Sequence, residues 1–196
     1  MREDVKFRRI KQEIRILAVD DCPFIPRQQD RVNIIGVVFC GGNWLDGAMH
    51  TSIDVDGFDV TSRIIGMISS SPHYNQLRVI MLDGITFAGF NIVDIPELFE
   101  VTGLPVLALT REKVHIENVR KAIKNLDKWE KRLELIDRAG VPQKIQVRGT
   151  ELHIQMAGIS REDVERIVRI SSTRGNIPEP LRVAHIVASA LEQLDQ

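Results

Sequence analysis

Short, uninterrupted apolar runs are the clearest pattern in the chain. Residues 16–19 and 79–82 are each four consecutive apolar residues, and a third run covers 105–109. The first two runs end at an acid, Asp20 and Asp83. Apolar runs of this length between polar residues are typical of strands that are buried on both faces. The pattern therefore predicts three buried strands.

Longer segments with alternating or β-branched residues predict further strands. Residues 31–40 are rich in Val and Ile and stop at a Gly-Gly-Asn turn, and residues 45–55 are expected to be the return strand. Residues 144–147 and 151–156 are expected to form a small hairpin about Gly149.

Other segments carry apolar residues at helical spacing. A helix is predicted to begin after Asp59 and to end before Pro72, because Val60, Ile64, Met67 and Ile68 form one stripe. The remaining predicted helices lie near 96–101, in two charged segments between 111 and 140, after the cap Ser160, and from Pro178 onward.

The last helix contains the most informative histidine. Its predicted stripe consists of Val183, Ile186, Val187, Ala190 and Leu194. His185 lies roughly opposite this stripe, so it is not expected to be a core residue. A solvated histidine is the ordinary interpretation, and a role in orienting water or a leaving group is the alternative.

The order of these elements predicts the fold class. Three strands followed by strands alternating with helices indicate an α/β fold, with a mixed sheet and helices on both faces. No repeat or linker divides the chain, so residues 1–196 are predicted to form a single domain. Ligand sites in such sheets lie beyond the carboxyl ends of the parallel strands, where Asp20, Asp21 and Asp83 are expected.

Composition narrows the class of protein without defining a function. The chain has 43 % hydrophobic and 27 % charged residues, which is ordinary for a globular protein. Cys22 and Cys40 have no metal-binding spacing, so neither a structural zinc site nor a disulfide framework is expected. The N-terminus lacks the apolar stretch of a signal peptide, and no run is long enough to span a membrane. A cytoplasmic protein is therefore expected.

Charge is unevenly distributed along the chain. The net charge is −1, but residues 111–148 hold 11 Lys or Arg against 6 Asp or Glu, which is +5 and leaves −6 elsewhere. One interpretation is that this segment binds a polyanion, and the other is that it only solvates its helices. The candidate phosphate contacts are Arg111, Lys113, Lys121 and Lys124.

The two acids that end apolar runs are the candidate chemical centre. If their strands are parallel neighbours, Asp20 and Asp83 converge, and a cation such as Mg²⁺ would relieve their repulsion. Such a cation could activate water and neutralise a phosphate. The alternative is that Asp83-Gly84 is an ordinary turn and that Asp20-Asp21 caps a loop. An aspartyl-phosphate mechanism of the haloacid dehalogenase type is excluded, because Met81 stands where that family has its nucleophile.

Three stretches of the sequence resemble endonuclease V, and more closely the archaeal endonuclease dU family. Residues 17–20 resemble its first metal-binding strand, and 79–84 resemble its Asp-Gly strand, which is followed by the Gly-x-Pro pattern of 103–105. The run Pro-Glu-Pro-Leu-Arg-Val-Ala-His at 178–185 resembles the family's ending and is the most specific match.

The resemblance implies a ribonuclease-H-like fold and a Mg²⁺- or Mn²⁺-dependent endonuclease for DNA repair. Its substrate would be DNA with a deaminated base, either deoxyuridine or deoxyinosine, which the enzyme nicks at or near the lesion. Asp20, Asp59 and Asp83 would hold the metal, and His185 would act with the two strand-end acids in catalysis. The extruded nucleotide would enter the Phe87–Asn91 loop.

Departures from the family pattern keep other functions open. The family's Glu before the helix is replaced by a choice of Asp54, Asp56 or Asp59, of which Asp59 occupies the matching junction. The wedge that separates the DNA strands is missing. Cleavage of inosine-containing RNA and a non-catalytic binding module therefore remain alternatives, and the oligomeric state stays open.

Overall fold

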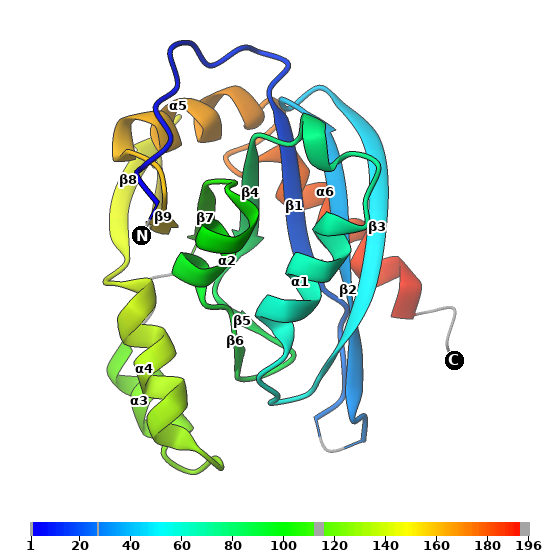
Figure 1. Ribbon diagram of the computed structural model, residues 1–196, viewed down its shortest axis with the longest axis vertical. Helices are drawn as coiled ribbons and strands as arrows, with labels where there is room; N and C mark the ends of the chain where they lie inside the picture. The colour runs from blue at the N-terminus through cyan, green and yellow to red at the C-terminus, as the bar shows by residue number, and fades with distance from the viewer. Residues whose placement is uncertain (1, 27, 112–115, 193–196) are drawn as a thin grey trace.

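Seven strands form one mixed sheet in the order β3-β2-β1-β4-β7-β9-β8 (Figure 1). The computed structural model describes residues 2–26, 28–111 and 116–192. The central strands are β1 (Arg15–Asp21), β4 (Val79–Asp83) and β7 (Val106–Thr110), which run parallel to one another. They correspond to the three apolar runs of the sequence, and their interiors are buried as predicted.

Antiparallel strands extend the sheet on both sides. β2 (Arg31–Cys40) and β3 (Trp44–Asp54) form the predicted hairpin next to β1. β9 (Thr150–Ala157) pairs with β7, and β8 (Gln143–Val147) is the outer strand. The turn between them contains Gly149 with a φ of 80°, a conformation that glycine adopts readily.

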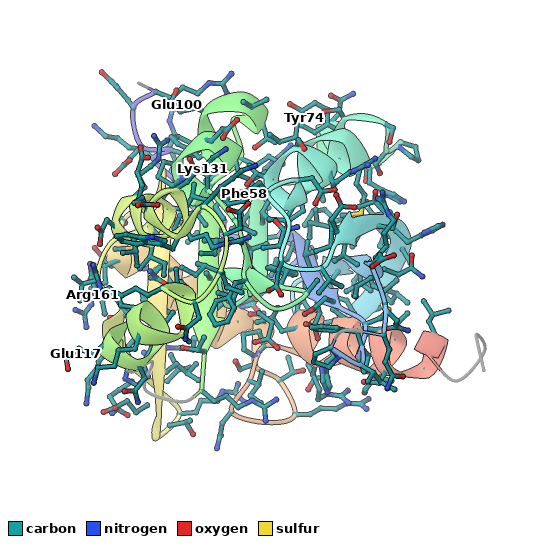
Figure 2. The ribbon with its side chains drawn as sticks, turned by 90° about the horizontal axis from the view of Figure 1, so that it is seen from below. Phe58, Tyr74, Glu100, Glu117, Lys131 and Arg161 are labelled. Carbon is teal, nitrogen blue, oxygen red and sulfur yellow. The ribbon has the colours of Figure 1, made fainter. Side chains whose placement is uncertain are left out.

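Helices cover both faces of the sheet. α1 (Val60–Ser69) and α2 (Ile95–Thr102) lie on one face, and α6 (Glu179–Glu192) lies on the other (Figures 1 and 2). α6 packs against β1, β2 and β4, so it runs directly behind the central strands. The predicted α/β class with a mixed sheet is confirmed.

Smaller elements fill the space between the layers. α5 (Arg161–Ser171) packs against β8, and its predicted cap Ser160 accepts a backbone N–H of the first turn. A short 3₁₀ helix (Tyr74–Gln76) leads into β4. A hairpin of β5 (Thr86–Phe87) and β6 (Asn91–Ile92) follows β4.

The basic segment forms two helices outside the main layers. α3 (Ile116–Ile123) and α4 (Trp129–Ala139) connect β7 to β8. They extend past the carboxyl ends of the parallel strands, at the lower left of Figure 1. Arg111 and the exposed lysines of α3 and of the turn after it therefore lie at the same end of the sheet as Asp20 and Asp83.

The apolar stripe predicted for α6 is wrong in part. The buried residues are Leu181, Ala184 and Ala188, whereas Ile186 is 50 % exposed and Ala190 is exposed. Leu194, also predicted in the stripe, lies outside the described residues. The small alanines let the helix backbone approach the sheet closely, so burial follows close packing and not side-chain hydrophobicity.

This shift of the stripe changes the place of His185. At about 100° per residue, His185 borders the buried face formed by Leu181, Ala184 and Ala188, and Ile186 takes the opposite side. His185 is exposed, as predicted, but it lies at the edge of the helix–sheet interface. That position brings it to the carboxyl end of β1.

Two further predictions from composition can be compared with the structure. No disulfide joins Cys22 and Cys40. Within the described ranges, no helix is both long enough and apolar enough to cross a membrane.

Candidate functional site

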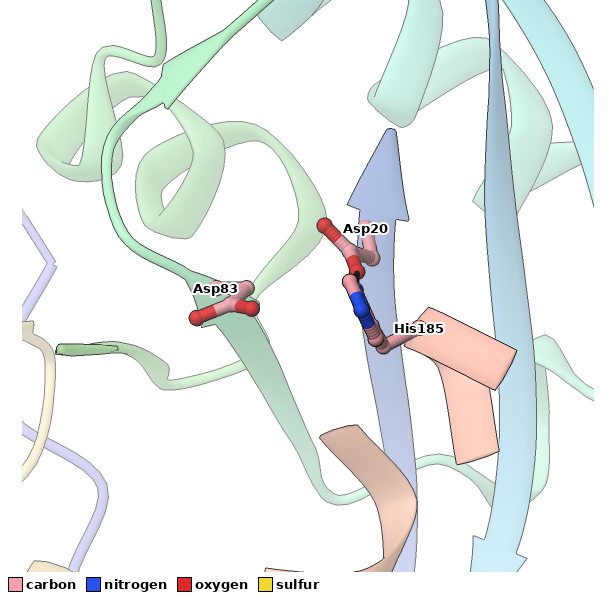
Figure 3. A group of neighbouring side chains, drawn as sticks. All are labelled: Asp20, Asp83 and His185. Atoms are coloured by element: carbon pink, nitrogen blue, oxygen red, sulfur yellow. Dashed lines mark hydrogen bonds and ion pairs between the residues drawn. The ribbon is translucent and has the colours of Figure 1, made fainter. Parts of the chain in front are cut away.

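Three side chains that are far apart in sequence meet at the carboxyl end of the central strands. Asp20 is the penultimate residue of β1, Asp83 ends the neighbouring strand β4, and His185 approaches from α6 (Figure 3). One potential ligand atom from each lies within 4.8 Å of the others. The parallel register, which pairs Val19 with Leu82, places the two acids side by side. The geometry brings together all three residues that the sequence had marked as catalytic.

Asp20 is the buried member of this cluster, with only 5 % of its surface exposed. Its Oδ1 accepts the N–H of Asp21 at 2.9 Å, and its Oδ2 is 2.9 Å from Nδ1 of His185. The pKa of Asp20 is raised to about 6, first by burial and next by the negative charge of Asp83, while the contact with His185 acts to lower it. The charged form of Asp20 is therefore unfavourable in this position unless a cation is nearby.

The neighbouring carboxyls show the same effect. Removal from water raises the pKa of Asp83, against the opposing influence of Arg111 and His185. Burial also raises the pKa of Asp21, although its Oδ2 accepts the N–H of Ala88 at 2.7 Å. Crowded acids of this kind are stabilised in their charged form by a nearby cation.

The donor set fits a hard divalent cation. Two carboxylates and one imidazole nitrogen are within reach of one point. Mg²⁺ and Mn²⁺ prefer oxygen ligands, which the two carboxylates would supply. Asp20 and Asp83 would supply the oxygens, and His185 would supply either a ring nitrogen or a contact to bound water.

Asp59, which was predicted as the third ligand, is not brought into this group. Its Oδ1 accepts N–H groups from Asn91 and from the backbone of Asp54, and its Oδ2 pairs with Arg63 at 3.2 Å. Burial acts to raise the pKa of Asp59, but these donors hold it below its ordinary value. Its side chain makes no cap hydrogen bond either, and the N–H of Val60, the first helical residue, donates to Oδ1 of Asn91. Both oxygens of Asp59 are already occupied, one by the buried amide of Asn91 and the other by Arg63, one turn along α1.

The predicted phosphate contacts are arranged along the same end of the sheet. Arg111 follows β7 and is close enough to Asp83 to lower its pKa. Lys121 is exposed on α3, and Lys124 is exposed directly after the end of that helix. Lys113 lies outside the described residues.

A small hollow beside the cluster contains two arginines. Asp83 and His185 line it together with Arg111 and Arg182. Buried Glu179 holds Arg182 in place, with Oε2 accepting from Nε at 2.9 Å and from Nη2 at 2.6 Å. Sequence reasoning missed a role for Arg182, although the Pro-Glu-Pro-x-Arg run was the signal that could have indicated it.

The loop predicted to receive a base is closed. Phe87, Ala88 and Asn91 are fully buried, so most of the Phe87–Asn91 segment packs into the core. A second, apolar hollow begins instead on the other side of this hairpin, at Gly84 and Ile85, directly after Asp83. It is walled by apolar residues of α3 and α4.

The sheet order and the acids at its carboxyl end define the ribonuclease-H-like class. Solved structures agree: human endonuclease V, in its catalytic domain, has a TM-score of 0.62 at 14 % identity, covering 100 % of this chain and 90 % of that chain. The Argonaute of Marinitoga piezophila, with guide RNA and target DNA, has a TM-score of 0.52 at 8 % identity, covering 91 % of this chain and 30 % of that chain. At these identities the likeness is one of fold alone.

Within this class the chain belongs to the Endonuclease dU family, whose model matches residues 12–192. It is 53 % identical over 190 residues to a protein of Methanothermobacter thermautotrophicus named UPF0215 protein, covering 96 % of this chain and 93 % of that one. It is also similar to a crystal structure of a protein of unknown function from Archaeoglobus fulgidus, with 37 % identity, a TM-score of 0.82, and coverage of 91 % and 98 %. The family predicted from the sequence is confirmed, and family and fold together indicate a nuclease.

Proposed function

We propose that this protein is a Mg²⁺- or Mn²⁺-dependent endonuclease that nicks DNA at or near a deaminated base, deoxyuridine or deoxyinosine. The observation that carries the proposal is the cluster of Asp20, Asp83 and His185 at the carboxyl end of the central strands. When bound, a divalent cation supplies positive charge opposite a phosphate and lowers the pKa of water.

The protein's own groups divide the remaining work. Asp20 and Asp83 hold the cation, and burial of Asp20 fixes its position. His185 is oriented by its contact with Asp20, which leaves Nε2 to take or give a proton at the attacking water or the leaving group. Arg111 and Arg182 would bind the phosphate that lies in the hollow beside Asp83.

The likeness to endonuclease V supports nucleic acid as the partner. One solved structure is that of Ciona intestinalis endonuclease V in complex with DNA containing an inosine, with a TM-score of 0.61 at 14 % identity. Lys121 of α3 and Lys124, directly after it, would contact backbone phosphates, and such contacts do not depend on the base sequence.

Labelled strands that contain one uracil, one hypoxanthine or no lesion test this proposal. Each strand is offered as single- and double-stranded DNA, with and without Mg²⁺ or Mn²⁺. We expect nicking of a lesion strand only with the metal, and none by Asp83→Asn of unchanged thermal stability. Full activity in excess chelator, or equal cutting of all strands, would contradict the proposal.

A non-cleaving nucleic-acid-binding module is the second candidate. It is favoured by the placement of Asp59, which leaves the cluster with two carboxylates where the family pattern expects three. Lesion-selective binding without nicking in the same panel would select this candidate. An inosine-containing RNA strand, added to the panel, would separate an endoribonuclease from a DNA enzyme.

A further inference from the structure

The apolar hollow next to Asp83 has the character of a pocket for a flat, uncharged ring. Its walls are Ile85, Val119, Ile136 and Pro142, and it begins at Gly84, one residue after the acid of the cluster. Apolar walls with few polar groups are typical of sites for small aromatic ligands. Because the hollow adjoins the cluster, a nucleotide whose phosphate lies near Asp83 could place its base here.

Gln155 supplies the only side-chain amide among the described residues that line this hollow, beside the hydroxyls of Thr86 and Thr110. It lies on β9, opposite Ala108 of β7, and its side chain lines the hollow. Its amide nitrogen donates to the backbone oxygen of Gly140 at 2.7 Å. Because a carbonyl oxygen can only accept, this bond orients the amide with Nε2 toward Gly140. The other atom of the amide, Oε1, acts only as an acceptor. No hydrogen bond to Oε1 is made by the part of the chain that the structure describes.

Deamination changes one ring atom in the same way for both common lesions. Cytosine has a bare ring nitrogen at N3, and uracil has an N–H there. Adenine has a bare nitrogen at N1, and hypoxanthine has an N–H there. A fixed acceptor therefore binds the deaminated base and faces a lone pair in its parent base, and such a mismatch leaves a polar group unsatisfied. Thymine and guanine carry the same ring N–H, so this contact separates each lesion from its parent base and not from those two bases.

We propose that Gln155 distinguishes the deaminated base from its parent base, with its amide oxygen accepting the ring N–H that uracil and hypoxanthine share and that cytosine and adenine lack. The inference rests on the proposed function and names the feature of the substrate that this site reads. The competing interpretation is that Gln155 only ties β9 to the end of α4 through Gly140.

Gln155→Lys separates these two interpretations. A lysine keeps a donor for the Gly140 oxygen but offers no acceptor to a base. Gln146→Leu, at an exposed position on the neighbouring strand β8, is the matched control.

The experiment measures binding by fluorescence anisotropy in EDTA, so that it does not depend on cleavage. Three labelled single strands differ at one position, which is cytosine, uracil or 3-methyluracil; the methyl group removes the N–H. We expect the unaltered protein and Gln146→Leu to prefer the uracil strand by about tenfold over the other two. Gln155→Lys should lose the preference for uracil over cytosine and over 3-methyluracil, while its added positive charge changes the affinity for all three strands alike.

Either of two results would overturn the inference: Gln155→Lys retains the preference, or the unaltered protein does not prefer uracil over 3-methyluracil. Failure of the proposed function is a different result. A protein that prefers uracil through Gln155 but nicks nothing with Mg²⁺ or Mn²⁺ would remove the endonuclease and leave the selecting role of Gln155 intact.

Discussion

The carboxyl of Asp20 is buried beside a second acid, and this placement makes its charged form unfavourable in the folded protein. Its pKa is about 6 in the fold against 3.8 for the ordinary group. The folded state thus keeps the proton to higher pH than the unfolded state does. The stability that this group contributes is present below about pH 4 and is lost as the pH rises through 6.

Replacing Asp20 by Asn should therefore stabilise the metal-free protein at pH 8. A shift from 3.8 to about 6 corresponds to at most about 3 kcal/mol in the free energy of unfolding. Chemical denaturation in EDTA at pH 4 and pH 8 measures this, and the gain should disappear at pH 4. Asp30→Asn, at an exposed position, is the control. A variant that is less stable than the parent at both pH values would contradict the argument.

Asp59 is the residue whose predicted role the geometry supports least. Asp59→Ser removes the acceptor for Asn91 and the backbone of Asp54, so it should lower the free energy of unfolding by about 1–2 kcal/mol. Metal binding, measured by calorimetric titration with Mn²⁺, should be unchanged. Loss of metal binding at full stability would instead make Asp59 a ligand, as the sequence had suggested.

At the scale of elements, a single buried arginine attaches α4 to the loops near the site. Arg132 is 3 % exposed, and its guanidinium donates to the backbone oxygens of Asp56, Gly57 and Phe90. It also lies 4.2 Å from the ring centre of Phe58. Burial lowers the pKa of Arg132, and the planar group satisfies several carbonyls at once, which a lysine cannot do.

The loops that Arg132 binds are connected in turn to β1. The N–H of Phe90 donates to Asp56, and the N–H of Ala88 donates to Asp21, the neighbour of Asp20. Residues 56 and 88 both have positive φ, a conformation that is uncommon outside glycine and that these bonds help to maintain. The basic helices are thus joined to the acidic cluster by a continuous set of hydrogen bonds.

Arg132→Gln should destabilise the protein by about 3 kcal/mol, because it leaves three partly buried carbonyls without their donor. The control is Lys131→Gln, since Lys131 also faces the Phe58 ring, at 4.8 Å, but is exposed (Figure 2). The midpoint of thermal unfolding should fall for Arg132→Gln and change little for the control. Equal effects of the two changes would mean that the ring contact, and not the carbonyl network, is what matters.

At the scale of the whole molecule, part of the positive charge of residues 111–148 lies at one end of the sheet. The basic helices α3 and α4 extend beyond the carboxyl ends, whereas α5 lies at the opposite end (Figure 1). Binding to nucleic acid should therefore depend on a local patch despite the net charge of −1.

Changing Lys121 and Lys124 to Glu should weaken binding to every sequence alike. Removal of two phosphate contacts should reduce the slope of log affinity against log salt concentration by about 1.5. Changing Arg166 and Arg169 on α5 to Glu alters the charge equally at the far end and should leave the slope as it is. Equal losses from the two pairs would indicate a general charge effect and count against the α3 surface.

The sequence by itself determined most of the strands and helices and the two acids of the candidate site. Apolar runs ending at Asp20 and Asp83 fixed two strands and their terminal acids, because burial on both faces requires continuous apolar residues and the strand must end where charge begins. The cap at Ser160 and the turn at Gly149 are local signals of a few residues, and the structure bears them out.

Only the tertiary structure decided which distant groups meet. His185 was singled out for facing away from a stripe that proved to be rotated, since the alanines of α6 pack against the sheet and the larger Ile186 does not. Asp59 could not be assigned from sequence, because its partner Asn91 is 32 residues away and takes an oxygen that a metal would need. Contacts of this kind depend on how helices and loops pack against the sheet, and no local pattern of residues records that packing.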